Sequence, residues 1–461
     1  MKKHILFLAL CYTVLNINAQ SVTTGNDLID DAFGLAIQTI DMNTKNGLLE
    51  AGAGYGGEWT RDAAMNAWNC VSLLRPAVAE ASLWSVTENK QRIGHQYWDK
   101  IIWTIGAWNH YLVTGEEDFL QQAYPCIRTT MQELEHDVFD TNYKLFMGPA
   151  VYQDGIEAYD EPIYDPAKSD QGSVLMHNSD SIKCLSTNIL YYQCYRLLAQ
   201  MAQKLEPSRV AEYTQKADAL KKRIREVYYK PGDHKLVYLI DHLGHEHNYQ
   251  EGIGYAFAGL FGILSPSETK IMLSQAEISP HGITAIYPSL PRNTKDKPGR
   301  HNVMVWPHVN MYYAAACAQN DVTDRFYFEM ENVADLAINK GKRNFYEIYT
   351  IDGIPSGGYQ CGHEWDVKEH QTWCATSYIG NIINYIFGLK FQENGIKFAP
   401  MGWPQSTKLQ LKGIRYRNMT LEINIKGNGP AIVDFKINGK SQSSPFVPGT
   451  LSGKVKVDIT M

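Results

Sequence analysis

Trp59, Arg61 and Asp62 stand together at the start of a helical pattern that continues through Trp68 and Leu74. A carboxylate and a guanidinium can bind sugar hydroxyls through paired hydrogen bonds, and an indole can pack on the C–H face of the ring. The same positions also suit an ordinary helix start with a local ion pair. The motif therefore indicates either a sugar site or a capped helix.

Acidic residues in two loop-like stretches could supply the chemistry of a hydrolase. Asp154 and Glu157 flank Gly155 and follow Tyr152, and a partly desolvated carboxyl group in such a loop can act as a general acid. A solvated acidic loop is the alternative there. Glu347 is flanked by aromatic residues and followed by a glycine-rich stretch, and such a carboxylate is costly to bury unless it is used or paired.

Two carboxyl groups on different loops suit glycoside hydrolysis, because one protonates the leaving oxygen and the other activates water or attacks carbon. Trp306 and His308 open another helical pattern, which indicates either part of the site or a helix start with proline in its first turn. Glu364 and Glu369 are competing acids, which we expect on a solvated rim and in a first helical turn respectively.

Other kinds of site fit the sequence less well. His363 and His370 lack the close spacing of a helical zinc pair, and we find no phosphate loop or dinucleotide fingerprint. We therefore expect neither a metal nor a cofactor. A net charge of -6 and a pI near 6.2 give no electrostatic basis for binding nucleic acid or anionic membranes. Most cysteines lie in apolar helical patterns, which favours buried thiols, although Cys361 and Cys374 could pair.

Residues 1–19 have the features of an export signal. Two lysines precede an apolar stretch too short to span a bilayer, and Ala19 offers a cleavage site before Gln20. Cys11 follows a bulky leucine and is a poor site for lipid attachment. No later segment is long and apolar enough to cross a membrane, so we expect a periplasmic or secreted protein.

Helical periodicity dominates the chain from residue 26 to residue 389, and alternating strands follow from residue 395. Short turns alternate with long loops, which predicts a toroid of helix hairpins with the site at the long-loop end. We expect a signal over 1–19, an α-helical catalytic barrel over 20–394 and a small antiparallel β domain over 395–461. The predicted helices cover 26–40, 61–76, 94–114, 117–137, 182–203, 208–228, 250–262, 266–276, 305–319, 322–341 and 371–388.

The order of these motifs resembles that of the six-hairpin glycosidases. The Trp-Thr-Arg-Asp run from Trp59 to Asp62 resembles the sugar-gripping motif of glucoamylases. The Phe-Tyr-Glu-Ile-Tyr segment around Glu347 resembles the base-bearing segment of trehalases and of the processing and bacterial α-glucosidases. The resemblance covers residues 30–390 in order and spacing, and it implies an (α/α)6 barrel, a mainly α fold and an inverting mechanism.

The resemblance divides the assignment of the acid between two residues. These families carry Glu-Ser-Gly-x-Asp, whose final Asp is the acid, where this chain has Gln-Asp-Gly-Ile-Glu. Glu157 occupies the family position, and Asp154 lies three residues earlier. Either could protonate the leaving group.

We therefore expect an exported, exo-acting, inverting glycoside hydrolase that removes an α-linked sugar, such as an α-glucoside, from an oligosaccharide or polysaccharide. Glu347 would activate water and Arg61 with Asp62 would hold the terminal sugar, while Trp59, Tyr152 and Trp306 would form aromatic walls. Two alternatives remain open. A polysaccharide lyase or sugar epimerase on the same fold would use His308 and Tyr152 for proton abstraction, and a non-catalytic protein would only bind glycans.

Overall fold

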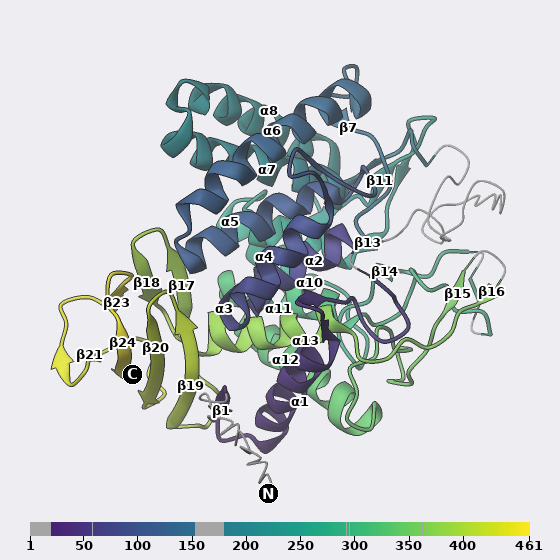
Figure 1. Cartoon of the computed structure of the whole chain (residues 1–461). Helices are drawn as coiled ribbons and strands as arrows, with labels where there is room; N and C mark the ends of the chain where they lie inside the picture. Colours follow the sequence, from purple (N-terminus) through teal and green to yellow (C-terminus); the bar gives the residue numbers. More distant parts are fainter. Residues whose placement is uncertain (1–19, 58, 153–178, 292, 295, 361–362) are drawn as a thin grey trace, which may run out of the picture.

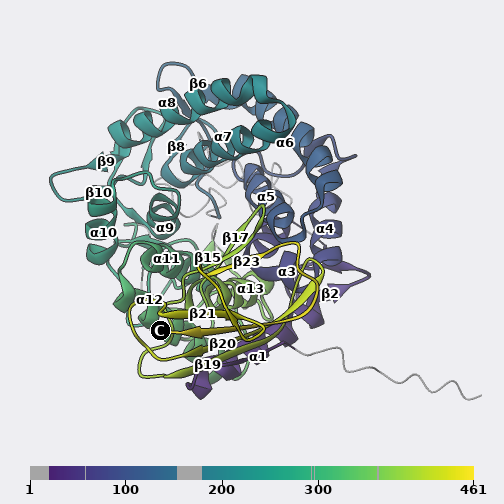
Figure 2. The same ribbon diagram turned by 90° about the vertical axis from the view of Figure 1, so that its left-hand side faces the viewer.

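The computed structural model describes residues 20–57, 59–152, 179–291, 293–294, 296–360 and 363–461. Most of this chain forms a closed double ring of helices, with a β domain at one end (Figures 1 and 2). Consecutive members of the inner ring contact one another, and α13 closes the ring against α2. The inner segments are α2 (Thr60–Asn66) with η1 (Ala67–Val71) and α3 (Ser72–Leu74), α5 (Trp103–Thr114), α7 (Leu185–Leu205), α9 (Gly252–Leu260), α11 (Pro307–Gln319), and α13 (Thr372–Asn381) with η5 (Ile382–Ile386).

The outer ring packs against the inner one, and each outer helix precedes an inner helix in the chain. Its members are α1 (Asp27–Asn43), α4 (Pro76–Ser85), α6 (Glu117–Val138), α8 (Val210–Tyr228), α10 (Pro266–Gln275), and α12 (Thr323–Asp335) with η4 (Leu336–Lys340). Short turns lead from inner to outer helices and long loops lead back. This is the (α/α)6 toroid expected from the hairpin pattern.

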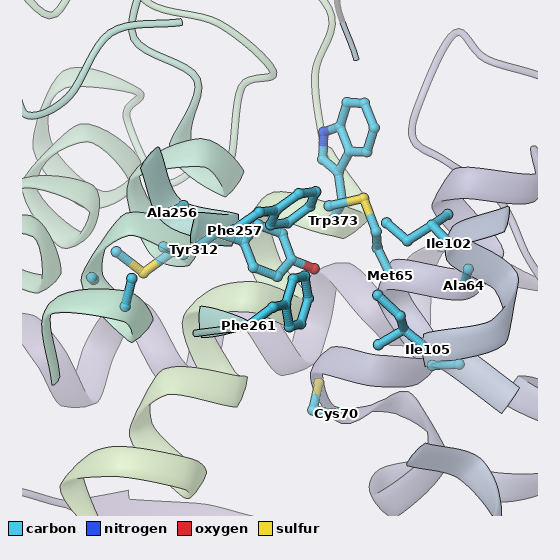
Figure 3. Close-up of a cluster of buried hydrophobic side chains, with 14 of the residues drawn as sticks. Ala64, Met65, Cys70, Ile102, Ile105, Ala256, Phe257, Phe261, Tyr312 and Trp373 are labelled. Carbon is cyan, nitrogen blue, oxygen red and sulfur yellow. The ribbon is translucent and has the colours of Figure 1, made fainter. Parts of the chain in front are cut away.

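The two rings differ in sequence because they differ in burial. On α11 every residue from Pro307 to Cys317 is buried, as expected for a helix surrounded by other helices. On α8 only one stripe is buried, at Tyr213, Ala217, Leu220, Ile224 and Tyr228. In Figure 3 aromatic and aliphatic side chains from several inner helices fill the middle of the ring, and the indole of Trp373 stands at the edge of this cluster.

The β domain contains a six-stranded sheet and a three-stranded sheet. The larger sheet has the order β1 (Ser21–Thr23), β19 (Lys408–Tyr416), β20 (Met419–Lys426), β24 (Gly453–Thr460), β21 (Asp434–Ile437) and β22 (Lys440–Ser441). The smaller sheet has the order β17 (Leu389–Gln392), β18 (Gly395–Phe398) and β23 (Phe446–Pro448). Both draw strands from outside the C-terminal stretch, namely β1 and β17.

Short strands stiffen the long loops, and brief 3-10 turns lead into two of the helices. The strands are β2 (Thr44–Lys45), β3 (Leu48–Leu49), β4 (Thr87–Glu88), β5 (Arg92–Ile93), β6 (Phe139–Asp140), β7 (Leu145–Phe146), β8 (Lys183–Cys184), β9 (Tyr229–Lys230), β10 (Lys235–Leu236), β11 (Leu239–Ile240), β12 (Glu246–His247), β13 (Gln250–Glu251), β14 (Ile286–Tyr287), β15 (Tyr359–Gln360) and β16 (His363–Glu364). The 3-10 turns are η2 (Lys100–Ile102) and η3 (Pro207–Arg209). None of the described helices combines the length and apolar character needed to cross a bilayer.

Three sequence-based expectations differ from the structure. The outer helix α4 was not predicted, because its small apolar residues lie on all sides and give no amphipathic stripe. The helix expected over 94–114 begins only at Trp103, because the preceding residues form a loop and then the 3-10 turn η2. The β domain is not wholly antiparallel, since β24 returns after the β21–β22 hairpin and pairs with β20 in parallel.

Candidate active site

All six inner helices begin at the end of the ring that carries the long loops. At the starts of α2, α11 and α13, Arg61, His308 and Trp373 lie close together. The start of α7 joins them through Ser186, which accepts a hydrogen bond from the Val151 amide at 3.1 Å. Helix N-termini carry partial positive charge, so their convergence favours carboxylates at this end.

Glu347 is buried in the long loop that precedes α13. It is only 4% exposed, and its amide donates to the Lys368 carbonyl at 3.0 Å. Its Oε2 atom accepts hydrogen bonds from Arg300 at 2.5 Å and from the Tyr55 hydroxyl at 3.0 Å. Oε1 accepts none from the described residues. One oxygen is therefore fixed, and the other is available to a water molecule.

Arg300 is held as firmly as the carboxylate it pairs with. It donates to the Gly357 carbonyl at 2.8 Å and to the Tyr55 hydroxyl at 2.9 Å, and its guanidinium lies over the ring of Trp306. A Cβ atom on Gly358 would lie 2.5 Å from Arg300 Cα, and the φ of Gly358 is +70°. The glycine-rich stretch after Glu347 therefore lets its backbone pass against Arg300.

The Trp59–Asp62 motif enters α2 without forming a side-chain cap. Trp59 is the N-cap residue, yet it makes no capping hydrogen bond, and its ring packs edge-on against His95. Arg61 forms an ion pair with the fully buried Asp99 at 3.2 Å. Asp62 is 5% exposed. Buried charges in a first helical turn do more than cap it, which favours a role in binding.

Trp373, at the start of α13, is the centre of an aromatic wall. His308 stacks on its indole at 4.2 Å between centroids, and Tyr152 packs edge-on at 5.7 Å. Trp306 lies 6.3 Å away, and the Arg61 guanidinium lies 5.8 Å from the ring centroid. Sequence segments more than two hundred residues apart are thus brought together around one indole.

Three side chains in this wall carry polar atoms without a hydrogen-bond partner among the described residues. These atoms are both ring nitrogens of His308, the Tyr152 hydroxyl and the Trp373 indole N–H. Burial lowers the pKa of His308 well below its usual value and raises the pKa of Tyr152, so both side chains are uncharged near neutral pH. Tyr152 also adopts a φ of 64°, which is strained for a bulky residue. Unpaired buried groups and local strain are typical of a site that a ligand completes.

Several predicted residues fall elsewhere. Asp154 and Glu157 lie outside the described residues, as does Cys361, so their placement relative to Glu347 stays a prediction. Cys374 is a buried free thiol. Glu364 is exposed, as expected for an acid on the rim. Glu369 is exposed too, but it does not lie in the first turn of a helix as expected, because α13 begins only at Thr372.

Sequence reasoning missed Tyr55, Asp99, Arg300 and Trp373. Each lies in a long loop or at a helix start near a predicted residue, but nothing in the sequence gives its distance from Glu347 or Arg61. Trp373 was visible as a tryptophan in the first turn of a predicted helix, as Trp306 and Trp59 were. Among the described residues, this site holds no trio of His, Cys or acidic side chains close enough to bind a metal.

Comparison with known proteins identifies the family of this chain. The family model of the mannosylglycerate hydrolase MGH1-like glycoside hydrolase domain matches residues 55–374, which include every described candidate residue. No curated protein matches the sequence.

Solved structures show the same fold at low identity. A sialidase is 13% identical with a TM-score of 0.70 and covers 96% of this chain, which spans 40% of the sialidase. A rhamnosidase from Klebsiella oxytoca with rhamnose bound is 13% identical with a TM-score of 0.60, covering 80% of this chain and 66% of its own. The GH63 mannosylglycerate hydrolase from Thermus thermophilus in complex with glucose is 12% identical with a TM-score of 0.57, covering 76% and 99%.

The expected resemblance to six-hairpin glycosidases is confirmed. The family match favours a glycoside hydrolase over a lyase, an epimerase or a protein that only binds glycans. A carbohydrate substrate follows from that class. The chain belongs to the family of mannosylglycerate hydrolase MGH1-like glycoside hydrolase domains, and it is a glycoside hydrolase.

Proposed function

We propose that this protein is an exo-acting, inverting hydrolase of α-linked hexosides, with Glu347 as the base. The observation that carries the proposal is the buried Glu347 carboxylate, fixed through one oxygen by Arg300 and Tyr55, at the end of the ring where the aromatic wall lies. The guanidinium balances the buried charge, which would otherwise be costly.

In the proposed reaction, Glu347 Oε1 accepts a proton from a water molecule as the water oxygen bonds to the anomeric carbon. The bond from that carbon to the glycosidic oxygen breaks, and Asp154 or Glu157 gives its proton to the leaving oxygen. An inverting enzyme places the two carboxyl groups about 6.5–9.5 Å apart, which leaves room for the water. We expect that separation between Glu347 and the acid.

Charged and neutral side chains would both form hydrogen bonds with the sugar. Arg61 and Asp62 offer paired hydrogen bonds to hydroxyls, whereas His308, Tyr152 and the Trp373 indole offer single neutral ones. Trp59 and Trp306 would add apolar contact with the ring.

The substrate is proposed as an α-glucoside or an α-mannoside of small size. The names of the relatives include a mannosylglycerate hydrolase and a complex with glucose, and these sugars define the first compounds to test. We also propose export, with residues 1–19 removed. In support, β1 begins at Ser21, two residues after Ala19, so the processed chain would keep this strand. Mass spectrometry of the mature N-terminus tests export, and retention of residues 1–19 after expression in a secreting host would contradict it.

The activity is tested by incubating the protein with α- and β-linked glucosides, mannosides and mannosylglycerate and following the products by NMR. We expect hydrolysis of an α-linked compound with the β-anomer released first. The α-anomer appearing first would refute inversion, and hydrolysis of only β-linked compounds would refute the proposed substrate class.

The base is tested by Glu347→Gln, with Glu369→Gln as the matched control on the same loop. We expect the first to abolish turnover while the protein still binds the sugar, and the second to leave turnover unchanged. Full activity of a folded Glu347→Gln variant would remove this residue from the mechanism.

The acid is tested by Asp154→Asn and Glu157→Gln on two substrates. Loss of the acid should abolish cleavage of a disaccharide but spare a dinitrophenyl glycoside, whose leaving group needs little protonation. If both variants keep full activity on the disaccharide, neither residue is the acid.

A further inference from the structure

A second group of ligating side chains lies where the inner ring turns into the outer ring, away from Glu347. It consists of Glu80 on α4, His110 near the C-terminal end of α5, and Glu116 at the start of α6. One oxygen of each glutamate and a ring nitrogen of His110 lie within 4.8 Å of one another. Asp99, at the active-site end, precedes His110 by about three turns of helix, so the two sites are distinct.

His110 is the unusual member of this group. It is fully buried, and its Nδ1 atom lies 3.1 Å from the Ser72 hydroxyl, which orients the ring. Its Nε2 atom is also buried but has no hydrogen-bond partner among the described residues, since Glu116 Oε2 is 3.8 Å away. A buried imidazole nitrogen without a partner, beside two carboxylate oxygens, is an arrangement that a metal ion would complete.

We propose that Glu80, His110 and Glu116 form a binding site for a divalent cation of the zinc class. One imidazole nitrogen with carboxylate oxygens is a donor set of zinc and related transition metals, whereas calcium and magnesium prefer oxygen alone. The Ser72 hydroxyl lies at the other ring nitrogen of His110 and would orient the ring. Metal-binding histidines usually have such a contact at the nitrogen that does not bind the metal. Three protein ligands leave a fourth position for water, which the exposed side of Glu116 can admit.

Binding the ion requires a modest closure of the three side chains. Ligand atoms at about 2.0–2.2 Å from a tetrahedral zinc lie about 3.3–3.6 Å from one another. His110 Nε2 and Glu116 Oε2 are 3.8 Å apart, and the carboxylates would close in by up to about 1 Å, which the long side chain of the exposed Glu116 allows. Such an ion would join α4, α5 and the start of α6 at the outside of the ring, and its role would be structural.

The experiment uses the full-length protein without a histidine tag, treated with chelator and titrated with zinc chloride by calorimetry. We expect one equivalent of zinc to bind and the melting temperature to rise until the site is saturated. Glu80→Gln, Glu116→Gln and His110→Asn should each weaken binding at least about tenfold, as loss of a ligand weakens a metal site at least as much as loss of an outer contact.

His136→Gln is the matched control, because it removes an exposed histidine that lies 2.8 Å from the Asp137 carboxylate. It should leave zinc binding unchanged. If His110→Asn does not fold, the two glutamate variants decide the result, since Glu80 and Glu116 are at least partly exposed. No stoichiometric zinc binding, or equal binding by the glutamate variants and the wild type, would overturn the proposal.

Discussion

Replacing Arg300 with methionine should lower kcat/KM by about 10²- to 10³-fold, because the Glu347 carboxylate loses the cation that fixes one of its oxygens. Arg300 and Glu347 are each 4% exposed, and their nearest atoms are 2.5 Å apart. At an effective dielectric constant of about 20, unit charges about 4 Å apart attract each other by about 4 kcal/mol, and removing one partner of a buried ion pair typically costs about 3–5 kcal/mol. A loss of about 1.4 kcal/mol in transition-state stabilisation lowers the rate about tenfold. With water entering the space left by the guanidinium, we expect a loss of about 3–4 kcal/mol in kcat/KM.

The assay is kcat/KM on the α-linked substrate, with the melting temperature as a check on folding. Arg300→Lys keeps the positive charge and should restore part of the activity, although it loses the fixed contacts to Gly357 and Tyr55. Tyr55→Phe removes one neutral hydrogen bond of about 1 kcal/mol, so it should lower kcat/KM by less than about tenfold. If Arg300→Met does not fold, Arg300→Lys and Tyr55→Phe decide the result. Unchanged kcat/KM in folded Arg300→Met would refute the assignment of Glu347 as the base.

Three further predictions follow from buried polar groups. Asp62→Asn should lower kcat/KM by about 10²-fold with little change in folding, and unchanged kinetics would reduce Asp62 to a structural role. His308→Phe keeps the stacking on Trp373 but removes two nitrogens without described partners, so kcat/KM should fall by about 10²-fold while the melting temperature holds or rises; normal activity would contradict this. Burial raises the pKa of Glu329 to about 8, so the folded protein keeps a proton that the unfolded chain loses near its ordinary carboxyl range. Stability should therefore fall as pH rises from that range through about 8, by about 1.4 kcal/mol per unit for this residue, and Glu329→Gln should flatten urea-unfolding curves compared across that window.

The ring of helices could be predicted from the sequence because helix formation depends on residues that lie close together in the chain. Outer helices such as α8 show one buried stripe, and inner helices such as α11 are buried all round, so both read as helices from spacing and apolar content. The missed helix α4 begins with Pro76 at its first position, which is a start signal that could have identified it. The parallel pairing of β20 with β24 depends on how a distant segment returns to the sheet, which no local pattern encodes.

The candidate site was predictable only where its residues are neighbours in the chain. Trp59, Arg61 and Asp62 were recognised together because one turn of α2 carries all three. Arg300 lies 47 residues from Glu347 in sequence, and an arginine in a loop carries no signal of its partner. Such pairs exist only after the ring closes and brings the long loops to one end.

The charged and the neutral groups of this site have different roles, because the charged groups already have partners and the neutral groups do not. Arg300 with Glu347 and Arg61 with Asp99 are charge pairs held among buried residues, so their positions are fixed before a substrate arrives. Prearranged charges of this kind need little reorganisation during a reaction. His308, Tyr152 and the indole of Trp373 are uncharged and have no partner among the described residues, which makes them costly to bury in the empty protein. A sugar hydroxyl that bonds to them would relieve that cost, so the neutral wall favours binding of the correct sugar while the charge pairs carry the chemistry.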